Sequence, residues 1–263
     1  MFADVLGYIG ALLIGVILGL MGGGGSILTV PLLVYLLGYN PVIATAYSLF
    51  IVGTSSVVGV IQKHREKLVD FKMGIAFTFP SFVAVYVSRR FMVPNIPDNI
   101  LKFNGYTLTK EMVIMVFFAI VMLIAATSMI KTKRNTNKHF VKQPYYKTFT
   151  QGLVIGTITG LIGAGGGFLY VPALVLWAGL PMKKAIGTSL VIVSTNSIIG
   201  FTGDLHSLNI DWIFLLSFSA LTIIGIIVGD YLSKYISGKK LKKGFGWLIL
   251  FMAIYILIEE TTL

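Results

Sequence analysis

The stretch GLMGGGGSILTVPLLVYLLG, residues 19–38, places four consecutive glycines between two apolar runs, and a second version, GLIGAGGGFLYVPALVLWAG, occupies residues 160–179. Glycine destabilises a helix interior and frees the backbone to turn, so both stretches predict an interrupted helix. About 13 apolar residues follow each glycine run. At 1.5 Å per residue they span about 20 Å, against a hydrocarbon core of about 30 Å. Each stretch therefore predicts a short helix that begins inside a membrane.

The composition agrees with a membrane protein. The 263 residues are 56% hydrophobic and 12% charged, and the mean hydropathy is +0.88. Apolar runs of helix-spanning length recur along the chain. The first run follows Met1 to Asp4 without a basic region or a cleavage site, so we interpret it as a retained membrane segment. Zero cysteines exclude disulfides, thiolate metal sites and a cysteine nucleophile, and they leave the redox compartment undetermined. No cofactor is expected.

The two glycine stretches belong to an internal repeat. Shifting the chain by 141 residues aligns residues 15–71 with residues 156–212 without a gap, and about 22 of the 57 aligned positions are identical. We therefore expect a duplicated unit, with an N-terminal repeat at 1–130, a basic linker at 131–147 and a C-terminal repeat at 148–263.

Each repeat contains five apolar segments. They lie at about 5–21, 26–38, 41–62, 71–88 and 111–130, then at about 147–163, 167–179, 182–203, 211–229 and 245–260. Five segments give an odd number of crossings, so the second repeat is expected to enter the membrane in the opposite sense. The predicted fold is an all-α polytopic membrane protein with two inverted-topology repeats. Whether each glycine-broken segment forms a re-entrant hairpin or a full crossing stays open.

The distribution of basic residues predicts the orientation. The net charge of +11 would suit a nucleic-acid partner, but Lys and Arg near span ends usually report topology. With the linker 131–147 on the cytoplasmic side, about 17 of the 21 basic residues share that side. Only Arg89, Arg90, Lys102 and Lys110 lie opposite, and the two arginines fit poorly. We expect a multi-pass protein of the inner or plasma membrane with a cytoplasmic linker, both termini outside and no nucleic-acid partner.

The glycine breaks predict an anion site. A helix start carries unpaired N–H groups and the positive end of the macrodipole, so it can hold an anion without a buried cation. Opposite insertion would bring both breaks together near the midplane. The segments that follow, residues 44–56 and 185–197, concentrate hydroxyl and amide groups that could line a pathway. The predicted substrate-binding residues are Gly22, Gly23, Gly24, Gly25, Ser26, Ser48, Thr54, Ser55, Gly163, Gly165, Gly166, Gly167, Thr188, Ser189, Thr195 and Asn196.

Structural alternatives apply to several of these groups. The small-xxx-small pairs Gly15/Gly19 and Gly156/Gly160 are expected to serve close helix packing, and Ser or Thr in membrane helices often bonds its own backbone. Neither glycine stretch fits a nucleotide-binding motif. Asp70 and Asp211 are expected to cap helices. For Asp204 and His206, a solvated loop is the default expectation, with a proton relay as the alternative. The three histidines fall in different predicted loops, so no metal site is expected.

Two copies of a Gly-rich break followed by Pro and a polar helix, GLMGGGGSILTVP with A-x-x-x-S and GLIGAGGGFLYVP with AIGTS, resemble the sulfite exporter TauE/SafE family over nearly the whole chain. The resemblance implies a bacterial or archaeal inner-membrane permease for small anions such as sulfite and sulfonates. The second break has Gly167 where the first has Ser26, so a symmetric pair of hydroxyl ligands is not carried onto both halves.

The favoured hypothesis is a secondary transporter that binds a small anion at the midplane and works by alternating access. The expected partners are the anion and the lipid bilayer, and a homodimer is compatible with the sequence. One alternative is a channel, or a proton- or cation-coupled carrier, in which unwound carbonyls bind an ion. Another is an accessory subunit that anchors a partner through the linker. An enzyme is the weakest hypothesis, because no nucleophile–base set is present.

Overall fold

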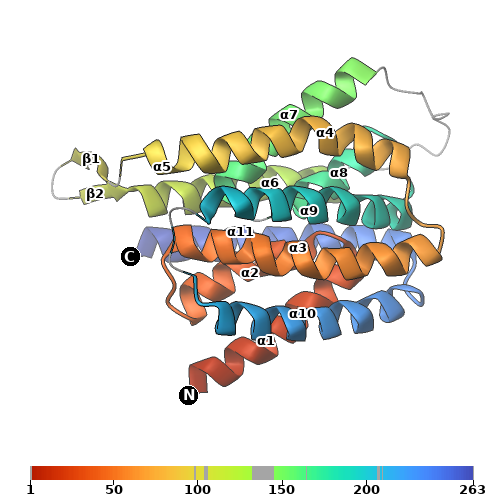
Figure 1. Ribbon diagram of the computed structural model, residues 1–263, viewed down its shortest axis with the longest axis horizontal. Coiled ribbons are helices and arrows are strands. Elements are labelled where there is room, and N and C mark those ends of the chain that lie inside the picture. The colour runs from red at the N-terminus through yellow and green to blue at the C-terminus, as the bar shows by residue number, and fades with distance from the viewer. Residues whose placement is uncertain are drawn as a thin grey trace.

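The computed structural model describes residues 2–97, 99–103, 106–131, 145–163, 165–205, 208 and 210–262. The predicted linker therefore lies mostly outside the described residues, as does His206. The described part is a bundle of helices with one small hairpin (Figure 1). In chain order the elements are α1 (Phe2–Met21), α2 (Gly24–Pro31), the π-helix η1 (Leu32–Leu36), α3 (Pro41–Arg65), α4 (Phe71–Val87), the π-helix η2 (Ser88–Met92), α5 (Val93–Asn95), β1 (Asn99–Phe103), β2 (Tyr106–Thr109), α6 (Lys110–Lys131), α7 (Tyr145–Ile162), α8 (Gly167–Leu176), α9 (Met182–Asp204), α10 (Trp212–Ser233) and α11 (Gly238–Thr262).

The ten predicted apolar segments match the ten main helices, and both glycine stretches interrupt the helical path where the sequence predicts. α2 with η1 covers 13 residues and α8 covers 10, so both remain shorter than a bilayer span. The widening into η1 follows Pro31, which has no backbone N–H to donate to the preceding turn. Within the described ranges, six helices are long and apolar enough to cross a membrane by length and composition.

Two features of the fold were not predicted from the sequence. The region after α5, which lies between two predicted apolar segments, contains the antiparallel pair β1–β2. α4 also continues through η2 and α5, so the helical path extends to Asn95. In contrast, the predicted caps are confirmed: the Asp70 carboxylate accepts from Met73 N, and Asp211 accepts from the N–H groups of Ile213 and Phe214.

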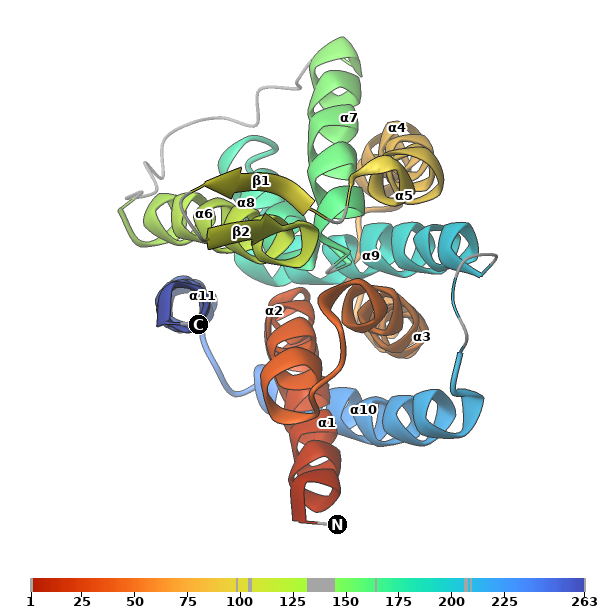
Figure 2. The same ribbon diagram turned by 90° about the vertical axis from the view of Figure 1, so that its left-hand side faces the viewer.

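The two halves make reciprocal contacts at positions 141 residues apart. A Cβ on Gly15 of α1 would lie 2.1 Å from the carbonyl oxygen of Thr222 in α10, and a Cβ on Gly156 of α7 would lie 2.5 Å from that of Ser81 in α4. The predicted packing role of these small residues is therefore confirmed. Figure 2 shows α1 with α10 on one side of the bundle and α7 with α4 on the other, with α3 and α9 between them.

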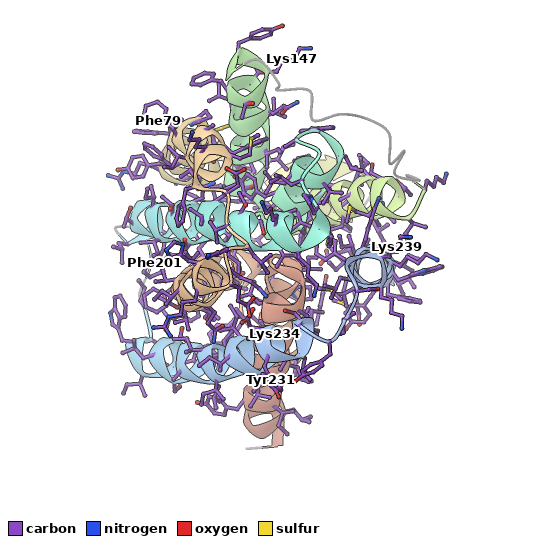
Figure 3. All side chains as sticks on the ribbon, turned by 90° about the vertical axis from the view of Figure 1, so that its right-hand side faces the viewer. Phe79, Lys147, Phe201, Tyr231, Lys234 and Lys239 are labelled. Atoms are coloured by element: carbon purple, nitrogen blue, oxygen red, sulfur yellow. The ribbon has the colours of Figure 1, made fainter. Side chains whose placement is uncertain are left out.

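The bundle has two ends, which we name for what they carry. β1 and β2 lie at the hairpin end, on the left in Figure 1. The opposite end, which we call the lysine end, carries Lys147 at the start of α7, Lys234 after α10 and Lys239 in α11 (Figure 3). α3 runs from the hairpin end to the lysine end, and α9 runs in the opposite direction (Figure 1). The last residues of α3 therefore lie at the lysine end, and the last residues of α9 lie at the hairpin end.

Large apolar side chains cover much of the outer surface. Examples are Ile75 at 62% exposed, Phe79 at 61%, Ile124 at 63% and Phe251 at 64%. A water-soluble monomer rarely exposes so many large apolar side chains. The interior contains an aromatic and aliphatic cluster that joins α6, α8 and α11 through Phe118, Phe168 and Phe245. The polar groups of the candidate site lie within this otherwise apolar bundle.

Candidate functional site

The two glycine breaks meet, backbone against backbone. A Cβ on Gly23 would lie 2.1 Å from the carbonyl carbon of Gly167, and a Cβ on Gly167 would lie 2.4 Å from Cα of Gly23. Gly23 directly precedes α2, and Gly167 is the first residue of α8. The starts of both short helices are therefore held in direct contact inside the bundle, and neither position has room for a side chain.

Neither helix start carries a side-chain cap. Gly23 and Gly166 occupy the N-cap positions of α2 and α8, and neither can supply a capping side chain. The first N–H groups of a helix have no partner within it, and each start carries about half a positive charge. Two such ends placed together repel each other, and a negative charge between them would relieve that repulsion. This chemistry favours an anion.

Five of the six remaining break glycines have conformations or surroundings that require glycine. Gly22, Gly163, Gly165 and Gly166 have φ between +67° and +70°, in the left-handed region. A Cβ on Gly25, whose φ is not positive, would lie 2.6 Å from Leu18 Cβ. Gly24 and Ser26 belong to the first turn of α2.

Asn196 is the centre of a buried polar cluster beside the second break. Its Nδ2 donates to Ser81 Oγ at 2.6 Å and to Tyr170 Oη at 2.7 Å, so it ties α9 to α4 and α8. Its Oδ1 is buried without a hydrogen-bond partner in the described part of the chain. Ser197 Oγ also has no partner there, and it would lie 2.8 Å from a Cβ on Gly165. Such unsatisfied groups are expected where a ligand or water binds.

The structure places the other predicted polar residues in different roles. Thr54 and Ser55 donate to carbonyls of α3, and Thr195 donates to a carbonyl of α9. Ser189 donates to Ile186 O at 2.8 Å and lies 3.2 Å from Gly22 O. A hydroxyl that donates to a carbonyl does not offer that proton to an anion.

Two further predicted residues differ from these. The Thr188 hydroxyl accepts from the backbone N–H of Asp70, the residue that caps the start of α4. Ser48 Oγ is fully buried without a partner among the described residues, so its hydroxyl proton is available to a ligand. Ser56 and Ser197 are in the same condition, although they were not among the predicted site residues.

The expectation that Asp204 lies in a solvated loop is wrong. Asp204 ends α9, is 4% exposed, and accepts from Arg89 Nε at 2.8 Å. Arg89 is 1% exposed and also donates to Thr45 Oγ1 at 3.1 Å from Nη1. Arg89 fits the positive-inside pattern poorly because it is buried in an ion pair with Asp204 and does not mark the topology. A Cβ on Gly163 would lie 2.9 Å from Arg89 Nη1, so this cation adjoins the second break.

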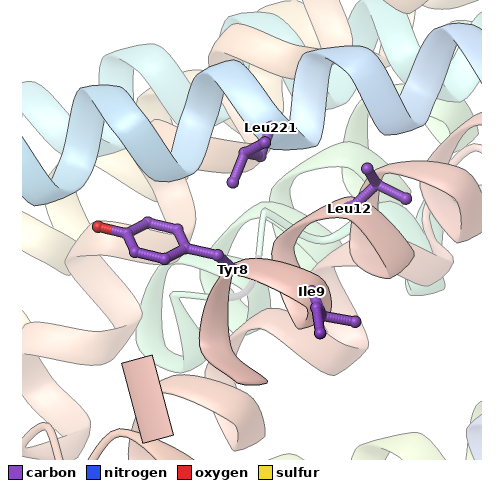
Figure 4. A pocket seen from close by; sticks show the side chains of 4 residues that line it. All are labelled: Tyr8, Ile9, Leu12 and Leu221. Atoms are coloured by element: carbon purple, nitrogen blue, oxygen red, sulfur yellow. The ribbon is translucent and has the colours of Figure 1, made fainter. Parts of the chain in front are cut away.

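Other candidate sites are weaker. A hollow lined by Tyr8, Ile9, Leu12 and Leu221 lies between α1 and α10, and only apolar side-chain surface and a tyrosine ring border it (Figure 4). It suits a lipid chain better than an ion. Over the described ranges, no three His, Asp or Glu side chains are grouped as a metal ion would require.

Six candidate spans, an apolar exterior and a buried polar centre define a polytopic membrane protein. The family described as "Sulfite exporter TauE/SafE" matches residues 8–256, and the chain belongs to this family of membrane transporters. A probable membrane transporter protein of Xylella fastidiosa is 28% identical over 252 residues, covering 93% of this chain and 91% of the relative. The probable membrane transporter protein YunE of Bacillus subtilis is 26% identical over 235 residues, covering 78% and 80%. A probable membrane transporter protein of Methanocaldococcus jannaschii is 24% identical over 261 residues, covering 94% and 92%. No solved structure matches.

Proposed function

We propose that this protein is a secondary transporter of a small anion, with sulfite, a sulfonate or a related sulfur oxyanion as its substrate, and that it works by alternating access. One observation carries the proposal: two helix starts without side-chain caps meet at Gly23 and Gly167. The family's description as sulfite exporters supports sulfur oxyanions as the substrate class.

In the proposed mechanism the anion lies where the two helix starts converge. N–H groups from the first turns of α2 and α8 bind its oxygens, and the free hydroxyls of Ser48 and Ser197 add donors from α3 and α9. The closed contact between Gly23 and Gly167 represents the state without substrate, because it leaves no space between these residues. Entry of the anion would separate the two starts, and the relieved repulsion would compensate for the lost contact.

The proposed orientation has the lysine end in the cytoplasm, in keeping with the positive-inside rule. The sequence has no nucleotide-binding motif, so the driving force would come from gradients or from the membrane potential. For an exported anion, an inside-negative potential favours exit by about 2.3 kcal/mol per charge for each 100 mV.

The test is flux in liposomes. Purified protein is reconstituted, and efflux of sulfite and of a small sulfonate is followed with and without Na⁺ and with an imposed potential. We expect an anion flux that does not require Na⁺ and that an outside-positive potential accelerates. Flux of a cation without flux of any small oxyanion would contradict the proposal and favour a cation carrier.

The variants Gly24→Leu and Gly165→Leu address the site. Both are expected to abolish flux while the protein still folds in detergent. Gly74→Ala serves as the control, because a Cβ there would make only ordinary contacts, at 3.6 Å from Thr188 Cγ2. Normal flux in both leucine variants would contradict the assignment of the breaks as the binding site.

A further inference from the structure

Two buried ion pairs occupy positions that the repeat makes equivalent. Lys63 in α3 binds Asp230 in α10, and Arg89 in η2 binds Asp204 in α9. The 141-residue shift aligns Lys63 with Asp204, and its continuation past the end of the aligned region aligns Arg89 with Asp230. The same contact has thus formed twice, with the signs of the charges exchanged. Each pair joins one helix of the first half to one helix of the second.

The first pair lies at the lysine end, where α3 and α10 both terminate. Lys63 is 3% exposed and Asp230 is 5% exposed. Besides contacting Asp230, Lys63 Nζ donates to Ser233 Oγ at 2.8 Å and to Glu66 Oε2 at 3.2 Å. Lys234 Nζ lies 2.8 Å from Glu66 Oε1, so the network extends from the buried pair toward the surface.

The second pair lies at the hairpin end, where α9 terminates and α4 continues into η2. Arg89 directs Nε and Nη2 at the same oxygen of Asp204, at 2.8 Å and 2.5 Å. Its Nη1 and Nη2 also donate to Thr45 near the start of α3, at 3.1 Å and 3.2 Å. This pair therefore fastens three helices at the end opposite the first pair.

Ion pairs suit a contact that must open. Replacing a buried ion pair by apolar side chains of similar volume is often neutral or stabilising, so two such pairs are poorly explained by stability alone. Apolar contacts that open to water lose their hydrophobic free energy. Separated charges regain hydration instead, which brings the open and closed states closer in free energy. Once one partner is missing, the remaining buried charge strongly favours water.

We propose that the two pairs are alternate gates: Lys63–Asp230 closes the lysine end, Arg89–Asp204 closes the hairpin end, and one pair separates at a time. This inference rests on the alternating-access transport proposed above. In the structure both pairs are formed and the glycine breaks are in contact, so both ends are closed. Each gate is made between the halves, so a rocking motion of one half against the other opens one gate while it tightens the other.

Cysteine accessibility tests this directly, because the natural chain has no cysteine. Ala44 and Ala185 are both 0% exposed and are equivalent under the 141-residue shift. Ala44 adjoins Thr45 at the hairpin end, and Ala185 lies two residues before Gly187, where a Cβ would be 3.2 Å from Lys63 Cβ. The variants A44C and A185C are therefore matched probes, one for each gate. Their labelling by a charged, water-soluble maleimide is measured in detergent, where both ends are accessible.

Asp204→Asn removes the negative charge of the hairpin gate, leaves the charge of Arg89 and keeps the shape of the side chain. We expect labelling of the A44C probe to rise about tenfold or more and labelling of the A185C probe to stay unchanged or fall. At the lysine end, Asp230→Asn is combined with Glu66→Gln, because Glu66 would otherwise remain as a partner for Lys63. We expect the opposite pattern there. Glu66→Gln alone is the control, and it should leave both probes protected.

Two further results decide the inference. The exchanged pair Arg89→Asp with Asp204→Arg should restore protection of the A44C probe. Equal exposure of both probes in either charge variant would show general loosening and would overturn the gates, as would protection of both. Since labelling needs no substrate, end-specific exposure without sulfite flux would refute the proposed cargo and leave the gates standing. Sulfite flux without end-specific exposure would refute the gates and leave the proposed cargo standing.

Discussion

Replacing Gly23 by alanine tests the backbone contact on which the candidate site depends. The added Cβ would lie 2.1 Å from the carbonyl carbon of Gly167, whereas ordinary contacts begin near 3.4 Å, so the two segments must part by about 1.3 Å. Gly23 has a negative φ of −158°, outside the left-handed region, so the steric clash with Gly167 is the effect that this variant tests. Overpacking costs about 1–3 kcal/mol, and the upper end applies because backbone atoms cannot rotate away.

The assay is thermal unfolding of the purified protein in detergent. A cost of about 3 kcal/mol corresponds to a fall in Tm of about 6–12 °C for a chain of this size. Flux should fall as well, because the variant disfavours the closed state of the cycle. Gly167→Ala should behave similarly, since its Cβ would lie 2.4 Å from Gly23 Cα. The double variant should lose less than the sum of the two, because one separation relieves both clashes.

Gly74→Ala is the matched control. Its Cβ would make ordinary contacts at 3.6 Å, and exchanging glycine for alanine within a helix should stabilise by about 0.5–1 kcal/mol. The reasoning would be refuted if Gly23→Ala melted at or above the wild-type temperature, because the two helix starts could not then be in contact.

Three further predictions use the same stability assay. Asn196→Leu should cost about 1–3 kcal/mol by leaving the buried Tyr170 hydroxyl without its donor, whereas Thr127→Ala on an exposed helix surface should be nearly neutral; equal melting temperatures for the two would contradict the buried network. Asp211→Ala should cost about 0.5–2 kcal/mol by removing the cap of α10, and Asp211→Ser should recover most of it; a failure of serine to do better than alanine would count against capping. Burial alone would raise the pKa of Glu66, but the hydrogen bond from Lys234 and the charge of Lys63 outweigh burial and hold the pKa below the usual glutamate value. The ionised carboxylate therefore stabilises the fold by about 0–1 kcal/mol, and this contribution is complete above the usual glutamate pKa. The contribution is lost as the pH falls through the lower pKa of the folded state. Glu66→Gln should flatten this part of the acid limb of the stability–pH curve, and an unchanged limb would refute the assignment.

The helices and their interruptions were predictable because their causes are local. Apolar run length, glycine in the left-handed region at Gly22 and Gly163, and aspartates at helix starts all act within a few residues. The repeat added long-range information, because equivalent glycines make equivalent contacts: Gly15 of α1 packs against α10, and Gly156 of α7 packs against α4. The opposite insertion of the two halves, and the domain boundaries at the linker, remain predictions.

The partners within the site were not predictable from local pattern. Arg89 and Asp204 are 115 residues apart, and a charge near a span end resembles a topology marker whether it is solvated or buried. Likewise, sequence could not tell that Thr54 and Ser55 donate to their own helix while Ser48 does not. The repeat does hold one signal. Continuing its alignment beyond Phe71 places Arg89 opposite Asp230, so the amino-acid sequence by itself relates the four charged residues to one another.

The exchange of signs between the two ion pairs also constrains how the duplicated halves can assemble. Both cations, Lys63 and Arg89, come from the first half, and both acids, Asp204 and Asp230, come from the second. A dimer of two first halves, packed in the same way, would bury lysine against arginine, and a dimer of two second halves would bury two carboxylates together. Both ion pairs can therefore form only when one copy of each half is present. Loss of either half could not be compensated by supplying more of the other.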